Sequence, residues 1–185
     1  TSTVVEEEVA FGPENLGLPP DDLRERVDAA LAHVGLADAR HRDPRTLSAG
    51  QKARLAIASI LAMRPQCLVL DESTVLLDPA ARQGILDLVA RLHAEGLTII
   101  AITHNMSEAL RADRVVVLDA GAIALEGTPR EVFARADALD ALGLTLPPAA
   151  AIARGLRRRG LPLPEGIIAT EDLVPDAVRL GEVVR

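Results

Sequence analysis

The sequence predicts an α/β protein with a largely parallel sheet and a small helical appendage at its C-terminal end. Short apolar runs at 67–70, 97–102 and 114–118 are typical of buried strands. A segment of helical periodicity at 79–95 separates the first two runs, as expected of a parallel sheet with crossover helices. The proline-rich stretch 137–185 predicts short helices. A chain of 185 residues suits one domain with such an appendage.

The composition narrows the class of protein. Hydrophobic residues make up 49% of the chain, which is enough to build a core. The net charge of −7 and the presence of only two aromatic residues argue against a nucleic-acid partner. The single cysteine, Cys67, excludes an internal disulfide framework, and we expect it in the core. No apolar stretch reaches the roughly 18 residues that span a bilayer, so we expect a soluble protein of a reducing compartment.

The N-terminal third predicts a mixture of elements. Thr3 to Val5 is strand-like, and 11–15 is expected to be a loop. A helix is predicted to open at Pro19 and Pro20 and to stop at Gly35, because apolar residues recur between them at helical spacing. A polar loop is expected to follow.

Helix and turn signals continue along the rest of the chain. A buried helix is expected to begin near Ser48 or Ala49, and the next long helix begins at Asp78 with aspartate as N-cap. A short helix is predicted at 107–111. The strand at 114–118 should pair back with 122–125 as a hairpin, and a capping box then starts a helix at Thr128.

Four short motifs follow one another within 58 residues. They are Leu47–Gln51 at a helix start, Leu70–Glu72 at a strand end, Leu77–Pro79, and His104 after the next strand. In this order they resemble the signature motif, the Walker B strand, the D-loop and the switch histidine of an ABC-type ATPase. The resemblance covers roughly 1–127.

The resemblance implies the C-terminal portion of a P-loop NTPase domain, with a helical subdomain and a parallel-sheet core. Residues 1–136 would be a partial ABC ATPase domain. Its helical, signature-bearing subdomain would be 13–63, and the core from the Walker B strand to the switch histidine would be 64–127. Residues 137–185 would be the helical appendage.

The chemistry of the motif residues agrees with these implied roles. Ser48, Ala49, Gly50 and Gln51 lie at a helix N-terminus, where backbone N–H groups and the helix dipole suit a phosphate. The alternative is that Ser48 is only an N-cap.

Two acids end the first strand, at the sheet edge where such folds place ligands. Asp71 could hold Mg²⁺ through water, and Glu72 could polarise an attacking water; the alternative is two solvated acids. Asp78 could be only an N-cap, and His104 could be structural rather than a γ-phosphate sensor.

Two positions depart from the family pattern, and one motif is missing. Ala49 stands where a second glycine is usual, and Ser73 where proline is usual. The only lysine, Lys52, has no GxxxxGK[ST] spacing around it, so the family's Walker A loop is absent from this sequence. We therefore expect a truncated piece that binds ATP poorly by itself.

The segments 9–17 and 127–133 narrow the resemblance to the ATPases of energy-coupling-factor (ECF) transporters, the cobalt and vitamin importers. This implies ATP and Mg²⁺ as cofactors, and a location on the cytoplasmic face of the membrane. It also implies a second ATPase subunit and an integral-membrane subunit as partners, with 137–185 as a dimer contact. The run Arg157–Arg159 is expected to be a solvated helix face.

Two other functions remain open from the sequence. The chain could be a non-catalytic half-site that pairs with an intact ATPase subunit, although Asp71, Glu72 and His104 argue against this. It could also be a DNA-repair type of ABC ATPase, but 35–47 is too short for the coiled-coil insertion of that class. The transported solute, and whether the two ATPase subunits are identical, are not predicted.

Overall fold

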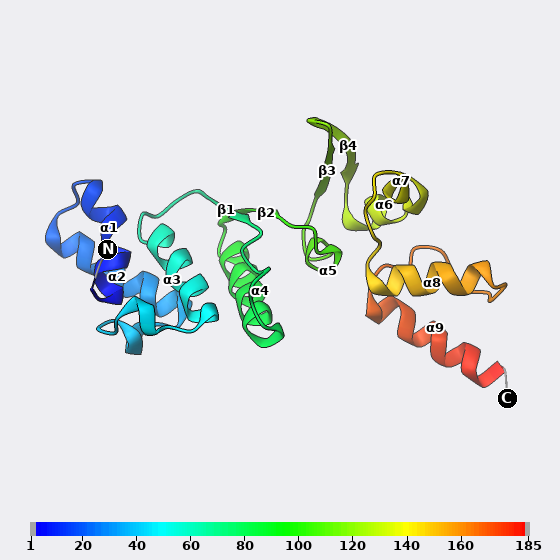
Figure 1. The fold of residues 1–185 in the computed structure, drawn as a ribbon, viewed down its shortest axis with the longest axis horizontal. Helices are drawn as coiled ribbons and strands as arrows, with labels where there is room; N and C mark the ends of the chain where they lie inside the picture. The colour runs from blue at the N-terminus through cyan, green and yellow to red at the C-terminus, as the bar shows by residue number, and fades with distance from the viewer. Residues whose placement is uncertain (1–2, 184–185) are drawn as a thin grey trace. The chain divides into compact units, whose positions relative to one another are not determined.

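The computed structural model describes residues 3–183 (Figure 1). The chain divides into two compact units, 1–102 and 103–185. The boundary expected after residue 136 falls inside the second unit, so the assignment of functions to domains stays a prediction.

The first unit begins with helices that pack on one another. They are α1 (Val5–Asn15), α2 (Pro20–Val34), η1 (Ala37–Ala39), η2 (Pro44–Thr46) and α3 (Ala49–Leu61). As predicted, α2 begins at the proline pair and ends at Gly35, whose φ of 69° is the left-handed conformation of a helix C-cap.

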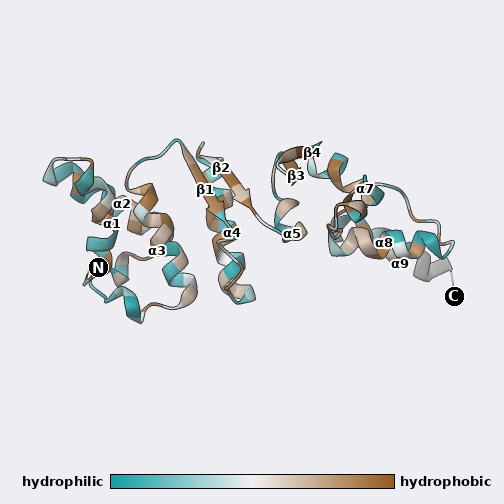
Figure 2. Ribbon diagram, turned by 45° about the horizontal axis from the view of Figure 1, so that its top comes forward, coloured by the Kyte–Doolittle hydropathy of each residue, from teal (hydrophilic) through white to brown (hydrophobic). Residues whose placement is uncertain are grey.

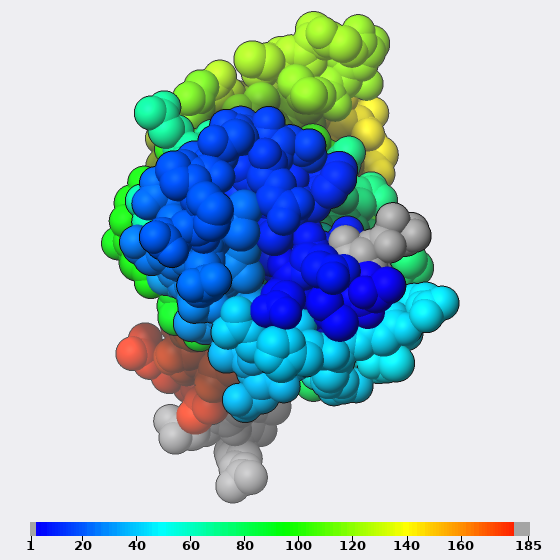
Figure 3. Space-filling model, turned by 90° about the vertical axis from the view of Figure 1, so that its left-hand side faces the viewer, coloured from blue at the N-terminus to red at the C-terminus, as the bar shows by residue number. Residues whose placement is uncertain are grey.

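The prediction for residues 3–15 was wrong: α1 includes Val5, the last residue of the expected strand, and all of the expected loop, while Thr3 and Val4 form no strand. Three glutamates fill the first turn of α1, where the helix dipole favours acids. The N–H groups of Val5 and Glu6 donate to the carbonyls of Arg42 and Arg40, at 3.0 Å each. The segment around 40–42 thus lies beside the start of α1 (Figure 3), a contact that a local reading of the sequence does not reveal.

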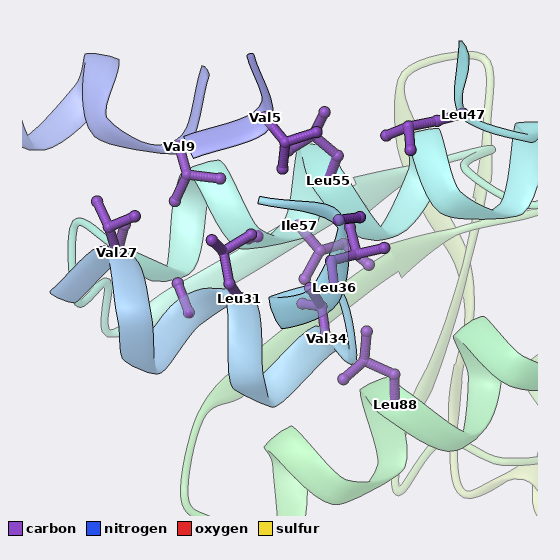
Figure 4. Packing of buried hydrophobic residues seen from close by; sticks show 14 of the residues in the cluster. Val5, Val9, Val27, Leu31, Val34, Leu36, Leu47, Leu55, Ile57 and Leu88 are labelled. Atoms are coloured by element: carbon purple, nitrogen blue, oxygen red, sulfur yellow. The ribbon is translucent and has the colours of Figure 1, made fainter. Parts of the chain in front are cut away.

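The core of the first unit is formed by α1, α2 and α3 together with residues of the later helix Pro79–Ala94, such as Leu88 (Figure 4). Val5 and Val9, one helical turn apart on α1, are fully buried. They pack in one cluster with Leu31 of α2 and Leu55 of α3. This burial holds the helices that carry the first sequence motif.

A strand–helix–strand segment completes the first unit. Strand β1 (Cys67–Asp71) pairs in parallel with β2 (Thr98–Ile102), and α4 (Pro79–Ala94) connects them. Asp71 lies opposite Ile102 in the register. The parallel arrangement is the one predicted, and it puts the end of β1 beside the end of β2.

Burial of these two strands differs from the prediction. Cys67 is exposed, so its assignment to the core was wrong. Successive side chains of a strand point to opposite faces. Leu68 is buried, whereas Val69 and Ile100 are about half exposed. Among the described residues, one face of this pair is therefore open, although both strands are strongly apolar (Figure 2).

The second unit contains a hairpin and several short helices. They are α5 (Met106–Ala109), β3 (Val115–Asp119), β4 (Ala122–Gly127), α6 (Pro129–Phe133), α7 (Ala136–Ala141), α8 (Pro148–Arg158) and α9 (Thr170–Val183). The capping box at Thr128 and the hairpin were both predicted. Among the described strands, however, β3 pairs only with β4, so its expected place in the parallel sheet was wrong. The turn explains the local pairing, because Ala120 and Gly121 both have positive φ, as tight hairpin turns require.

The appendage is helical, as expected. Its last helix, α9, continues through Pro175 without a break. The start of the helix is anchored by Asp172, whose carboxylate accepts from the N–H groups of Ile168 and Ala169 at 3.2 and 3.1 Å. Within the part of the chain that the structure describes, no helix has the length and apolar character needed to cross a membrane.

Candidate functional site

The first motif lies where α3 begins. Ser48 is the N-cap, and its Oγ accepts from the N–H of Gln51 at 3.2 Å. The Gln51 Oε1 in turn accepts from the N–H of Ser48 at 3.0 Å, which completes a capping box. The capping role that was the alternative for Ser48 is thus present, and it fixes the N-terminal turn whose N–H groups suit an anion.

The loop before this helix is held by a local ion pair. The Asp43 carboxylate accepts from the Arg45 side chain at 2.6 Å and from its backbone N–H at 2.8 Å. The Arg45 guanidinium, followed by that N–H, holds the pKa of Asp43 below its usual range. This carboxylate therefore stays ionised, and it caps η2 just ahead of Ser48.

Gly50 brings the first motif next to the third. A Cβ built on Gly50 would lie 2.8 Å from the Cβ of Ala81, so only glycine allows this approach of α3 to α4. The N–H of Ala81 donates to Asp78 Oδ1 at 2.9 Å, and Asp78 is therefore the N-cap of α4. Two helix N-termini, capped by Ser48 and Asp78, are thus held together around one alanine.

The second motif lies at the end of β1. Asp71 and Glu72 are both exposed there. Glu72 has a φ of 45°, which is uncommon for a residue with a side chain. Its N–H donates to the Ile102 carbonyl at 2.9 Å, so the contact with β2 continues one residue beyond the strand. The backbone under this carboxylate is fixed at the sheet edge.

The loop between Glu72 and Asp78 is ordered by turns but exposes apolar side chains. The N–H of Leu77 donates to the carbonyl of Thr74 at 3.1 Å, and both residues are buried. Between them, Val75 is 42% exposed and Leu76 is 91% exposed. The sequence analysis gave no role to Val75 or Leu76; the available signal was a run of three apolar residues, 75–77, directly after the acids that end the strand.

His104 lies in the second unit, two residues beyond the end of β2, and is exposed. Its neighbours are fixed by a small network. Thr103 Oγ1 accepts from the N–H of Asn105 and donates to Glu108, both at 3.0 Å. The Asn105 side chain caps α5. The structure thus brings Ser48, Gly50 and Asp78 together, whereas the γ-phosphate role of His104 remains a prediction. Glu108 was not anticipated from the sequence.

The residues at the end of β1 fit Mg²⁺ but do not form a closed metal cage. The described residues contain no group of three or more metal-ligating side chains. Mg²⁺ commonly binds one or two carboxylates and completes its shell with water and phosphate oxygens. An exposed aspartate at a strand end, such as Asp71, satisfies that requirement.

Comparisons with known proteins agree with this arrangement. The sequence profile of the ABC transporter family matches residues 1–75. The energy-coupling factor transporter ATP-binding protein EcfA1 of Symbiobacterium thermophilum is 55% identical over 174 residues, which is 94% of this chain and 61% of that protein. The corresponding EcfA protein of Methanosarcina acetivorans is 50% identical over 160 residues, 86% of this chain and 58% of that protein.

A solved structure is similar as well. CbiO1 from Clostridium perfringens, described as part of the ABC transporter complex CbiONQ, has a TM-score of 0.69 and 38% identity. The match covers 83% of this chain and 62% of that one. The chain thus spans about 60% of the length of these relatives.

The chain has the fold of part of an ABC-type P-loop NTPase domain, so the recognition and the fold class predicted from the sequence are confirmed. Over most of its length, the chain is similar to the ATP-binding proteins of energy-coupling factor transporters.

Proposed function

We propose that the protein containing this chain binds and hydrolyses ATP to energise an ECF-type importer of a metal ion or vitamin. One observation carries the proposal: the capped N-termini of α3 and α4 are packed together through Gly50 and Ala81. Such a pair of helix ends, with their free N–H groups and positive dipole ends, suits a polyphosphate.

Each motif residue has a role in this proposal. Ser48, Ala49, Gly50 and Gln51 bind the nucleotide held by a second subunit. When bound, Mg²⁺ would neutralise phosphate charge, and Asp71 would hold it through water.

Two further groups would act on the nucleotide held by the chain's own protein. Glu72 would orient and deprotonate the attacking water. His104 would hydrogen-bond the γ-phosphate.

A second ATPase subunit is the first proposed partner. The exposed Leu76 and Val75 lie in the loop that ends at Asp78, beside the helix end that would meet the partner's nucleotide. Burying such an apolar pair is favourable, by about 25 cal/mol per Å². We propose that this loop and the appendage at 137–185 contact the second subunit.

The other proposed partner is an integral-membrane subunit, which would keep the protein on the cytoplasmic face of the membrane. We propose no nucleic-acid partner, because the net charge is −7 and only two residues are aromatic. DNA binding that weakens steeply with salt would contradict this.

An alternative is a non-catalytic half-site, in which the chain supplies only Ser48–Gln51 to an intact ATPase subunit. The observation in its favour is the preformed capping box, which needs no other part of the site. A titration tests this role: adding the protein to an intact partner subunit should raise the partner's ATP turnover.

Ser48→Arg should abolish that activation, because the substitution removes the capping hydroxyl and the bulky arginine side chain fills the anion site. Ala56→Arg, at an exposed position farther along the same helix, should leave it unchanged. Equal activation by wild type and Ser48→Arg would disprove the role of this motif. Glu72→Gln separates ATP hydrolysis from the half-site role, because this substitution affects only turnover at the site that contains Glu72.

A further inference from the structure

Arg54 links its own helix to two other helices of the first unit. It lies on α3, one helical turn after Gly50. Its Nη1 donates to the carbonyl of Val34 at 3.4 Å, in the last turn of α2. Its Nη2 lies so close to α4 that a Cβ built on Gly84 would be 2.7 Å away.

These contacts form a second point of close approach between α3 and α4. The first is Gly50 against Ala81, and Arg54 against Gly84 follows one turn later on both helices. Each point depends on a glycine, and the two glycines lie on opposite helices. Two contacts a turn apart fix both the separation and the rotation of a helix pair, whereas a single contact leaves rotation free.

We propose that Arg54 is a positioning residue, which locks α3 to α4 so that Ser48 and Asp78 meet the nucleotide as one rigid unit. The inference rests on the proposed ATPase function and extends it to a residue outside the four motifs. Arg54 does not contact the nucleotide itself; it positions the two helix ends that do.

An arginine suits this task for a physical reason. The Val34 carbonyl is at the negative end of the α2 dipole, where a cation is favourable. The guanidinium is planar and has several N–H donors in fixed directions, so one nitrogen can bond that carbonyl while another lies close to Gly84. A lysine ammonium has the charge but lacks the flat, extended donor group.

A distance measurement tests the positioning without requiring ATP hydrolysis. Spin labels at Lys52 and Ala80, both exposed in the first turns of α3 and α4, would be placed in a Cys67→Ser background. Arg54→Ala should broaden or shift the distance distribution, whereas Arg24→Ala, at an exposed position on α2, should not. An unchanged distribution in folded Arg54→Ala would overturn the proposal.

A substitution on the other helix separates positioning from folding. Gly84→Ala raises the helix propensity of α4, but its Cβ displaces the Arg54 guanidinium. It should therefore change the label distances while the helix content is retained. Retained distances in this variant would contradict a role for the contact.

The kinetic test uses the complete protein assembled with its partner subunits. Arg54→Ala and Arg54→Lys should lower kcat on the order of tenfold at a KM for ATP within about twofold, because misplacement by a fraction of an ångström affects the reacting geometry most. A raised KM with unchanged kcat, or full rescue by lysine, would contradict the proposal. If the wild-type protein does not hydrolyse ATP, the proposed function fails, and the label distances still decide whether Arg54 positions the helices.

Discussion

Glu72 occupies a backbone conformation that few residues with side chains adopt. Its φ of 45° costs on the order of 1–3 kcal/mol for a residue other than glycine. The N–H bond to Ile102 and the bond from Val75 to the Glu72 carbonyl hold it there. The sequence predicted the position and the chemistry of this carboxylate. It could not predict the conformation, which depends on pairing between strands separated by a 16-residue helix.

Asp172 gives a pH-dependent prediction at the same scale. The Arg130 guanidinium, 2.9 Å away, and the N–H groups of Ile168 and Ala169 lower the pKa of Asp172. A carboxyl whose pKa is lower in the folded state stabilises the fold above its unfolded pKa, about 3.9, and that stabilisation is lost as the pH falls through the folded value.

Unfolding of the chain in urea at several pH values should therefore show an acid-side loss of stability. Asp172→Asn should be less stable than wild type near neutral pH, and the two should converge as the pH falls below about 4. Glu171→Gln, at an exposed neighbouring position, is the control. A constant difference between Asp172→Asn and wild type across this range would contradict the assignment.

At the scale of elements, the contact between α3 and α4 joins motifs that are 30 residues apart in the sequence, from Ser48 to Asp78. Two kinds of interaction join them. Capping bonds fix each helix start, and the small residues Gly50 and Ala81 allow the helices to touch. Cap residues could be identified from the sequence alone. The partner of Gly50 could not, because nothing local pairs position 50 with position 81.

Gly50→Ala should destabilise the first unit. The added Cβ would lie 2.8 Å from the Ala81 Cβ, and neither methyl group can rotate away. Overpacking of this kind costs about 1–3 kcal/mol, which at least offsets the gain in helix propensity of roughly 1 kcal/mol. The free energy of unfolding in urea measures the difference.

The double variant Gly50→Ala/Ala81→Gly supplies the control, because it exchanges the two side chains across the contact. It should recover most of the stability lost by Gly50→Ala, apart from the propensity cost of a glycine in α4. The account of this contact is wrong if Gly50→Ala is as stable as wild type, or if the second change adds only further loss.

The wrong predictions share one physical cause: tertiary contacts, and not the local sequence, decide the conformation or burial of these residues. The segment 5–15 has weak local signals, and the tertiary contacts of Val5, Val9 and the 40–42 carbonyls decide that it is helical. Cys67 lies on an apolar strand, but its burial depends on what covers that face. By contrast, α2, α3 and α4 carry their own caps and apolar periodicity, and the sequence predicts each of them correctly.

At the scale of the whole molecule, the residues with proposed roles are distributed over both units. The first carries Ser48, Gly50, Asp71, Glu72 and Asp78, and the second carries His104. The division falls between Ile102 and Thr103, directly after the strand that pairs with β1. The Thr103–Asn105–Glu108 hydrogen bonds then fix the backbone on both sides of His104.

ATP turnover by the complete, assembled protein tests the central claim most directly, with Glu72→Gln as the variant. Removal of a general base typically lowers kcat by about 10²–10⁴, and we expect a loss in this range with nucleotide binding retained. Glu14→Gln, an exposed glutamate near the end of α1, should leave turnover unchanged. Wild-type turnover by Glu72→Gln would contradict the assignment of Glu72 as the general base.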